Sequence, residues 1–202
     1  MSVRAITPDA PPVYVSGERA TGWWGMLLFV ATEATIFGCL LASYFYLRVS
    51  APVWPPSDIK LPELTLPIPM TILLVGSSLP MWWAESGIRR GKRGRLRLGL
   101  AIAFVLAAAF LIMQGIEYSH KEFAISTNAY GSLFYLITGL HGLHVLAALV
   151  MNVVVQVRAW LRHFDARRNL AVQNLALYWH FVDAVWIVIF LSLYISPYVL
   201  PD

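Results

Sequence analysis

The residues of this sequence that could do chemistry are a few ionisable side chains inside long apolar stretches. His141 and His144 lie in "YLITGLHGLHVLAALV", and His180 and Asp183 lie in "YWHFVDAVWIVIFLSLY". A third apolar stretch, nearer the start of the chain, is interrupted by Glu33. Such groups are costly in hydrocarbon, so each needs a partner or a role inside a bundle of helices.

The spacing of these residues suits two kinds of site. Side chains three residues apart, as in His141/His144 and His180/Asp183, project from one face of a helix. The histidines and carboxyl groups could therefore form one contiguous hydrogen-bonded network, or supply the three or four converging ligands that a metal or haem needs. We favour a buried polar network without a metal, in which Asp183 and His180 form an ion-paired lock. A metal or haem site is the alternative.

Glu33 has two interpretations of its own. A carboxyl group that is desolvated inside a span can stay neutral and serve only as a structural group. It can equally take part in proton chemistry at a surface that faces lipid. Glu33 lies about ten residues into its stretch, which is roughly 15 Å from one membrane face. The histidines reach a similar depth, so three helices place ionisable groups near mid-membrane.

Five apolar stretches predict the helices that must position these residues. They lie at about residues 23–47, 66–84, 98–116, 130–157 and 172–196. A helix needs roughly 20 residues to cross a membrane. Of all residues, 58% are hydrophobic and 13% are charged, against roughly 45–50% and 25% in soluble domains. We expect an all-α integral membrane bundle of five transmembrane helices at 23–202, after an irregular cytoplasmic arm at 1–22.

The distribution of basic residues predicts the orientation. With the N-terminus in the cytoplasm, twelve of the 15 Lys and Arg residues lie inside and three lie outside, as the positive-inside rule requires. The C-terminus then lies outside. These residues are topology signals in loops, and we expect no nucleic-acid partner. The single cysteine, Cys39, can form neither an internal disulfide nor a thiolate cluster.

Between the second and third spans we expect a basic loop at residues 85–97 that faces lipid headgroups. Its candidate headgroup ligands are Arg89, Arg90, Arg93 and Arg97. Pro80 should kink the second span, and Glu117 is expected at the membrane interface. Gly139 and Gly142 give the fourth span a small-residue face for close helix packing.

Several strings of the sequence carry a family resemblance. The most specific are "TGLHGLHV" at 138–145 and "YWHFVDAVWIVIF" at 178–190, with "WWGMLLFVATEATIFG" at 23–38 and "MQGIEYSHKEFAIS" at 113–126. Together they resemble subunit III of the haem–copper oxidases in its short, five-helix bacterial form. They occur in the family's order and cover nearly the whole chain from Trp23 onward. The short form lacks the first two helices of the seven-helix mitochondrial type, which help to form a lipid-filled cleft.

The resemblance implies a function and a set of residues. The family's subunit III is a non-catalytic accessory subunit of an aerobic terminal oxidase, and it packs on the catalytic subunit I in a complex with subunit II. It binds phospholipid and supports proton delivery and active-site integrity, while haem and copper reside in the partner subunits. The family's intramembrane glutamate falls on Glu33, its buried histidines on His141, His144 and His180, and its aspartate on Asp183.

The resemblance also implies a place in the cell. It is the bacterial inner membrane, where a supercomplex with a cytochrome c-reducing complex is a further expected partner. We favour a cytochrome c oxidase, with a quinol oxidase or a nitric-oxide-reductase-associated homologue as the alternative. A membrane haem or metal enzyme that uses His141, His144 and His180 is a candidate of another class. A small proton-coupled transporter that uses Glu33 ranks last, because the sequence shows neither repeats nor broken helices.

Overall fold

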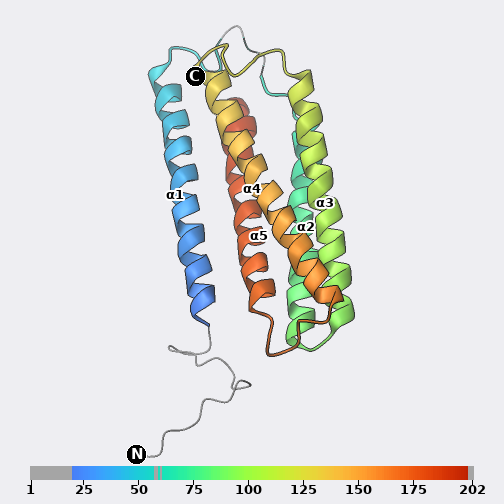
Figure 1. The fold of residues 1–202 in the computed structure, drawn as a ribbon. Coiled ribbons are helices and arrows are strands. Elements are labelled where there is room, and N and C mark those ends of the chain that lie inside the picture. The colour runs from blue at the N-terminus through green and yellow to red at the C-terminus, as the bar shows by residue number, and fades with distance from the viewer. Residues whose placement is uncertain (1–19, 57–58, 60, 200–202) are drawn as a thin grey trace, which may run out of the picture.

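Helices are the only regular structure in the part of the chain that the computed structural model describes, residues 20–56, 59 and 61–199 (Figure 1). The predicted all-α class is therefore confirmed. The five long helices are α1 (Thr21–Ser50), α2 (Pro67–Arg89), α3 (Arg93–His120), α4 (Ala129–Trp160) and α5 (Leu170–Ile189). A π-helical turn, η1 (Phe190–Ile195), and the short helix α6 (Ser196–Val199) continue α5.

The five long helices alternate in direction, so each one carries the chain from one end of the bundle to the other (Figure 1). The end at which α1 begins also holds the connections at residues 90–92 and 161–169, and we call it the basic end. α5 lies centrally and contacts α1, α2 and α4, while α2 and α3 form the most extensive helix pair. α1 stands at the edge and packs mainly against α5 and α4.

Four helical segments of the described chain are long and apolar enough to cross a membrane: α1, α3, α4 and the continuous segment Leu170–Val199. α2 is not among them, since it contains prolines and several hydroxyl side chains. These hydroxyl groups point into the bundle. Thr71 Oγ1 accepts a hydrogen bond from Trp186 Nε1 (2.9 Å), and Ser77 Oγ accepts one from Trp179 Nε1 (2.8 Å). The polarity of α2 is therefore directed at α5.

The structure corrects the basic loop that the sequence predicts at residues 85–97. α2 continues to Arg89 and α3 begins at Arg93, so only residues 90–92 connect them. Gly91 has a φ of 72°, and the N–H groups of residues 91 and 92 donate to the carbonyls of Ile88 and Gly87. This is the usual end of a helix at a glycine. Lys and Arg are good helix formers, so basic composition alone does not end a helix.

The other helices also extend a few residues beyond the predicted spans at most of their ends. Of the arm predicted at 1–22, residues 1–19 lie outside the described part, and Thr21 already belongs to α1. Pro80 lies within α2 and does not interrupt it, and the kink predicted there stays a prediction. The span lengths were underestimated because helices continue past the apolar core into polar residues.

At the end opposite the basic end, α1 is tied to the C-terminal turn. Arg48 is only 7% exposed, and its guanidinium donates to Ser196 Oγ (2.5 Å) and to the Ser196 carbonyl oxygen (3.2 Å). Tyr44, one turn before Arg48, is fully buried against the rings of Trp54 and Tyr130. These contacts fix the far end of the helix that is otherwise least embedded in the bundle.

Gly99 determines how closely α2 and α3 approach, and it gives a first test of the fold. A Cβ at this position would lie 2.5 Å from the Pro80 carbonyl oxygen and 2.8 Å from the Ala84 Cβ. We expect Gly99→Ala to push the helices apart and to lower the free energy of unfolding by about 1–3 kcal/mol, the usual cost of overpacking. Denaturation in detergent measures this change.

The matched control is Gly115→Ala on the same helix, where a Cβ would meet nothing within 4 Å. This variant should be neutral or slightly stabilised, because alanine favours a helix over glycine. Equal stability of the two variants would contradict the close packing at Gly99.

Candidate functional site

Glu33 and His144 join α1 to α4 halfway along both helices. His144 Nε2 lies 2.9 Å from Glu33 Oε2, and His144 Nδ1 lies 2.8 Å from the carbonyl oxygen of Leu140. A carbonyl oxygen only accepts hydrogen bonds, so Nδ1 carries a proton and Nε2 faces the carboxyl group. A second proton then lies between Nε2 and Glu33. If this proton is on the imidazole, the two side chains form an ion pair. If it is on the carboxyl group, they form a hydrogen bond between two neutral side chains.

Aromatic rings surround this pair on the protein side. The Phe37 ring centroid lies 5.0 Å from that of His144, and the Tyr178 ring stacks on His144 at 6.4 Å. The side chains of Glu33 and His144 are still 18% and 11% exposed. The pair therefore lies just below the surface of the bundle, where lipid or a neighbouring chain can reach it.

His141 serves a different contact from His144, although both are on α4. It is fully buried, and its Nε2 donates to the carbonyl oxygen of Val182 on α5 at 3.2 Å. The rings of Phe110 and Trp186 pack against it with centroid separations of 5.7 and 5.0 Å. Its Nδ1 is buried and has no hydrogen-bond partner in the described chain. A charged imidazole without a counter-ion is strongly disfavoured in such a place, so His141 is a neutral side chain that locks α4 to α5.

Ser78 on α2 joins the two predicted residues of α5. Its hydroxyl group bonds to Asp183 Oδ2 and lies 2.9 Å from His180 Nδ1. Asp183 is 4% exposed, and its Oδ1 has no hydrogen-bond partner within the described chain. The direct ion-paired lock between His180 and Asp183 is thus replaced by a bridge through a hydroxyl group. The sequence offered "SSLP" on the second span as a signal for this partner, but spacing alone did not connect it to α5.

The structure therefore divides the predicted network into separate groups. Glu33 and His144 form one, His141 stands alone, and Ser78 links His180 with Asp183. Each group is made between helices, so each fixes a helix contact as well as a polar side chain. In the described residues no set of three or more His, Cys, Asp or Glu side chains is arranged to hold a metal ion.

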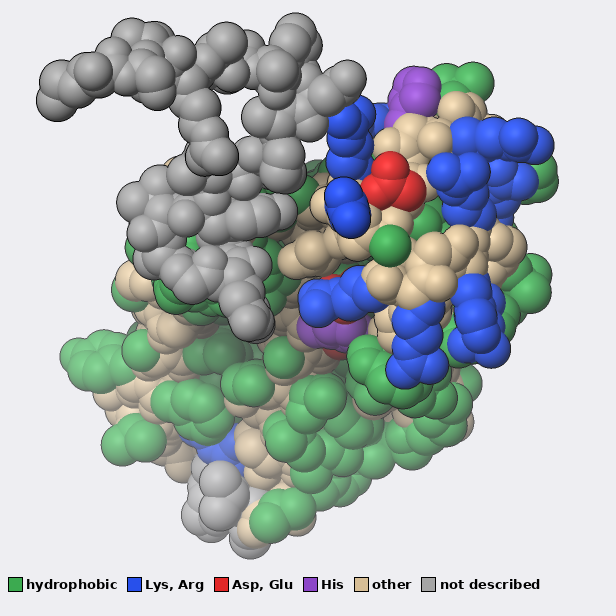
Figure 2. Space-filling model, turned by 90° about the horizontal axis from the view of Figure 1, so that it is seen from below, with side chains coloured by type: hydrophobic (Ala, Val, Ile, Leu, Met, Phe, Trp, Pro, Cys, Tyr) green, Lys and Arg blue, Asp and Glu red, His purple; other side chains and the backbone are tan. Residues whose placement is uncertain are grey.

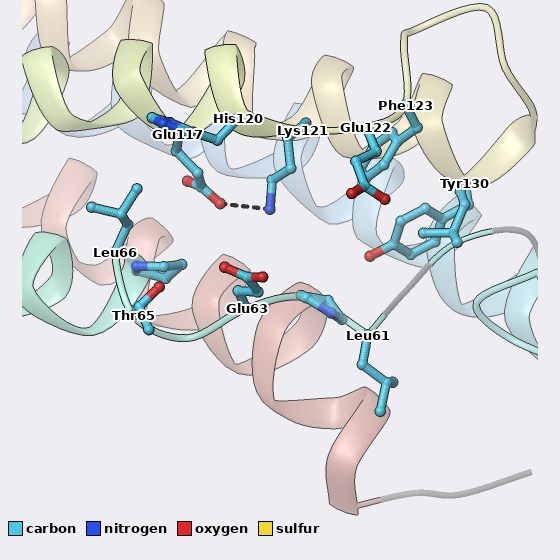
Figure 3. A pocket seen from close by; sticks show the side chains of 13 residues that line it. Leu61, Glu63, Thr65, Leu66, Glu117, His120, Lys121, Glu122, Phe123 and Tyr130 are labelled. Carbon is cyan, nitrogen blue, oxygen red and sulfur yellow. Dashed lines mark ion pairs between the residues drawn. The ribbon is translucent and has the colours of Figure 1, made fainter.

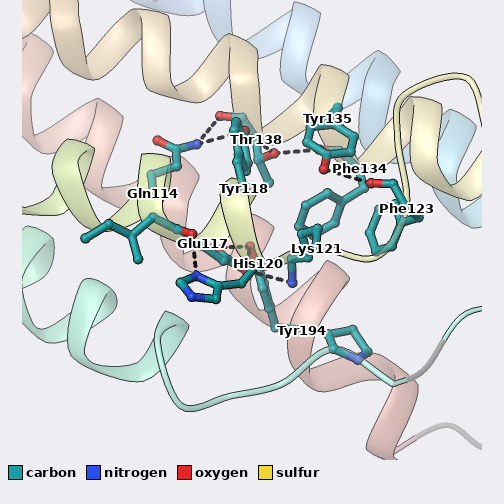
Figure 4. A network of polar contacts seen from close by, with 12 residues as sticks. Gln114, Glu117, Tyr118, His120, Lys121, Phe123, Phe134, Tyr135, Thr138 and Tyr194 are labelled. Atoms are coloured by element: carbon teal, nitrogen blue, oxygen red, sulfur yellow. Dashed lines mark hydrogen bonds and ion pairs between the residues drawn. The ribbon is translucent and has the colours of Figure 1, made fainter.

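A further polar cluster, which the sequence did not predict, lies at the end opposite the basic end (Figure 4). Glu117 is 4% exposed, and its Oε1 lies 2.9 Å from Lys121 Nζ. Tyr194 in η1 donates to the same carboxylate at 3.0 Å. Glu117, which was expected at the membrane interface, is thus part of a buried ion pair. The i, i+4 spacing of Glu117 and Lys121 is the feature of the sequence that could have predicted this pair.

The same cluster continues along the α3–α4 contact. Gln114 Nε2 donates to the Thr138 carbonyl oxygen at 2.8 Å, and the hydroxyls of Tyr118 and Thr138 are 2.6 Å apart. A Cβ on Gly142 would lie 2.9 Å from Gln114 Oε1, whereas one on Gly139 would come no nearer than 3.8 Å to Tyr118. Of the two predicted packing glycines, Gly142 is the one that the close approach requires.

A cavity of about 120 Å³ borders this cluster (Figure 3). The stretch that leads into α2 forms one wall, and the end of α3 with the start of the α3–α4 connection forms the other. Glu63 lies on the first wall, and Glu117, Lys121 and Glu122 lie on the second (Figure 3). Its volume is enough for a few water molecules.

The basic end gathers Lys and Arg side chains on one side of the molecule (Figure 2). Arg97 Nε donates to the carbonyl oxygen of Ala159 at the C-terminal end of α4 (3.2 Å), and Arg93 Nε donates to that of Phe164 in the connection that follows (3.1 Å). Positive charge is favourable at the end of a helix, where free carbonyls gather. Arg89 pairs with Glu85 at 2.5 Å.

Arg90 is exposed at the same end. Headgroup binding by the four arginines remains a prediction. In the adjoining connection, hydrogen bonds from the backbone N–H groups of Arg168 and Arg167 hold the pKa of Asp165 below its usual range. Asp165 therefore stays ionised and orders the chain just before α5.

The fold and its polar groups define a helical, multi-pass membrane protein whose mid-span ionisable side chains make hydrogen bonds between helices. The family described as "Cytochrome c oxidase subunit III" matches residues 19–198. The chain therefore belongs to the cytochrome c oxidase subunit III family, whose members are parts of an oxidase complex. The resemblance seen in the sequence is confirmed.

Curated relatives come from distant organisms. The "Cytochrome c oxidase subunit 3" of Synechocystis is 35% identical over 204 residues, which cover 96% of this chain and 87% of the relative. That of Pylaiella littoralis is 36% identical over 176 residues, 84% of this chain and 65% of the relative. That of Mus musculus is 33% identical over 189 residues, 91% of this chain and 71% of the relative. The chain thus spans about two thirds of some of the proteins it matches and most of the Synechocystis one.

The Glu33–His144 contact predicts a measurable coupling between two helices. Glu33→Gln should assemble normally, because an amide can still bond to Nε2. Glu33→Ala and His144→Ala should each destabilise the protein, and a double-mutant cycle should give a coupling of roughly 0.5–3 kcal/mol, as for residues in contact. Strict additivity in detergent unfolding would show that the two side chains do not interact. Failed assembly of Glu33→Gln would show that Glu33 is ionised and paired.

The Glu117–Lys121 pair predicts a larger effect than a surface pair of the same spacing. Its side chains are 5% and 12% exposed, so Lys121→Met leaves a buried carboxylate without its cation. Loss of one partner of a buried pair costs about 3–5 kcal/mol. Arg89→Met is the control, because Arg89 is 56% exposed in its pair with Glu85 and such pairs contribute about 0–1 kcal/mol. Similar losses in both variants would contradict the burial of the first pair.

Proposed function

We propose that this chain is the non-catalytic accessory subunit III of a respiratory terminal oxidase of the cytochrome c oxidase type. The observation that carries this proposal is the family match over residues 19–198. In this role it packs on subunit I beside subunit II, and the haem and copper that reduce O2 reside in those partners. It binds phospholipid and supports proton delivery and active-site integrity during turnover. The curated relatives named above are all cytochrome c oxidase subunits, which favours this branch over a quinol oxidase.

The geometry of the histidines favours an accessory role over a haem or metal enzyme. Both ring nitrogens of His144 are engaged, by Glu33 and by the Leu140 carbonyl. His141 and His180 bond to different parts of the bundle, Val182 on the one hand and Ser78 on the other. A shared metal would require these side chains to leave their present partners and converge, which breaks three helix contacts.

The path of the chain supports the proposal that α2 is a fifth membrane-spanning helix. α1 ends at the side of the bundle opposite to where α3 begins, and α2 is the segment that returns the chain (Figure 1). With 23 residues at about 1.5 Å each, α2 is roughly 35 Å long, enough to cross the hydrocarbon core. Its hydroxyl groups bind α5 and do not face lipid, so its lower hydropathy does not oppose insertion into the membrane. We place the basic end in the bacterial cytoplasm and the C-terminus outside, following the positive-inside rule.

The exposed face of α1 supports the proposal that a neighbouring subunit or tightly bound lipid covers this helix. Leu28, Ile36, Tyr46 and Val49 are between 46% and 85% exposed along its length. A face this long and apolar on a membrane helix needs hydrocarbon or another protein against it. Beside it, the partly exposed Glu33–His144 pair lies within reach of the same neighbour.

The test is purification of the tagged chain from its native membrane, followed by a reduced-minus-oxidised optical spectrum. Haem bands that co-purify and then leave with larger chains when the complex is stripped are the expected result. The band positions also identify the oxidase class. Haem that stays with the isolated 202-residue chain would instead make the histidines ligands. An absence of haem at both stages would remove the oxidase assignment and favour a transporter.

A further inference from the structure

The Ser78 group contains a buried carboxyl oxygen without a hydrogen-bond partner in the described chain, whereas the unpartnered atom of His141 is a ring nitrogen. Asp183 Oδ1 is buried and has no hydrogen-bond partner within the described chain, while Oδ2 is bonded to Ser78. An isolated carboxylate in such a place is strongly disfavoured, whereas a protonated carboxyl group is tolerated. His180, at the other side of Ser78, is only partly buried.

We propose that Ser78, His180 and Asp183 form a proton-binding relay in which a proton passes from His180 through Ser78 to Asp183. The relay is a property of this chain, and it does not depend on the chain's proposed place in an oxidase. Its ligand is a single proton taken up from the basic end of the bundle.

The heavy-atom positions fit two arrangements of the same hydrogen bonds. In one, His180 carries protons on both ring nitrogens; Nδ1 donates to Ser78 Oγ, and the Ser78 hydroxyl donates to ionised Asp183. In the other, protonated Asp183 Oδ2 donates to Ser78 Oγ, and the hydroxyl donates to the lone pair of neutral His180 Nδ1. A serine hydroxyl can donate and accept, so it can turn between these states.

The step between the two arrangements balances in atoms and charge. The N–H bond at His180 Nδ1 breaks as its proton moves to Ser78 Oγ, while the Ser78 O–H bond breaks as that proton moves to Asp183 Oδ2. His180 becomes neutral and Asp183 becomes a neutral acid, with the total number of protons unchanged. Uptake precedes this step and begins on a neutral His180 whose proton is on Nδ1. A proton from water then binds the lone pair of Nε2 and gives the doubly protonated ring of the first arrangement. The reverse sequence returns the proton from Asp183 to His180 and releases it from Nε2.

The direction of uptake follows from the antiparallel packing of α2 and α5. His180 precedes Asp183 by about one helical turn on α5, which begins at the basic end. On α2 the next acidic residue toward that end is Glu85, two turns beyond Ser78. The acidic side chain and the imidazole thus lie on the path from the basic end, and Asp183 lies at its inner limit.

The charged groups around α5 are few. α2 contributes Glu85, which is paired with Arg89. The Glu33–His144 pair of α1 and α4 faces α5 at Tyr178, two residues before His180 and five before Asp183. In the described residues, Asp183 is therefore held by Ser78 alone, and loss of that hydroxyl isolates it from His180.

The experiment uses the purified complex in lipid and follows the infrared carbonyl stretch of protonated carboxylic acids. The band assigned to Asp183 is the one that Asp183→Asn removes. After transfer into D2O the band shifts as the acidic proton exchanges. Ser78→Ala should slow this shift by roughly a hundredfold, the lower range of what a positioned proton-transfer group contributes. Ser78→Thr keeps a hydroxyl and should exchange like the unmodified protein.

The matched control is Ser77→Ala, which removes the neighbouring hydroxyl bonded to Trp179 but leaves the relay intact. It should exchange at the original rate. If Ser78→Ala does not assemble, His180→Gln interrupts the route at its other member and should slow exchange equally. The proposal is overturned if Asp183→Asn removes no such band, or if Ser78→Ala or His180→Gln exchanges as fast as the unmodified protein. None of these infrared readouts depends on oxidase activity. Their outcome is therefore separate from that of the haem spectrum that tests the proposed function.

Discussion

A polar side chain inside a membrane bundle is stabilised by a partner in the protein, and the contacts that supply such partners organise this structure. Several hydrogen bonds of the span interior run between helices: Glu33 to His144, His141 to the Val182 carbonyl, and Ser78 to Asp183. Water competes poorly for such groups in an apolar medium, so each contact selects one helix arrangement. The apolar surfaces of these helices would pack almost as well in other arrangements, since lipid is no less apolar than a neighbouring helix.

α5 receives most of these contacts, and they reach it from opposite neighbours. α1 and α4 approach one side with the Glu33–His144 pair, and α2 approaches another with its row of hydroxyl groups. The central helix thus keeps two proton-bearing groups apart. In an accessory subunit this separation allows one group to face a neighbour at the surface of the bundle, while the other stays within the chain.

Hydropathy and motif spacing predicted the five helices, their approximate positions and the ionisable residues that matter. They could not predict which helices those residues join, because spacing gives the face of a helix but not its neighbour. His141 and His144 share a face by spacing, yet one binds α5 and the other α1. Ser78 was missed because a serine in an apolar stretch resembles any other helix residue. The basic loop was overextended because charge was taken as the end of a helix, whereas Gly91 ends it.

The π-helical turn η1 has a consequence for how this chain can change over evolutionary time. Such a turn accommodates one residue more than an α-helical turn, so it arises or disappears through a single-residue insertion or deletion. One residue corresponds to a rotation of about 100° around the helix axis. Tyr194 and Ser196 would then turn away from Glu117 and Arg48, which they contact now. Substitutions on the lipid-facing side of this segment are tolerable. A change in its length by even one residue is not, because it would break these contacts.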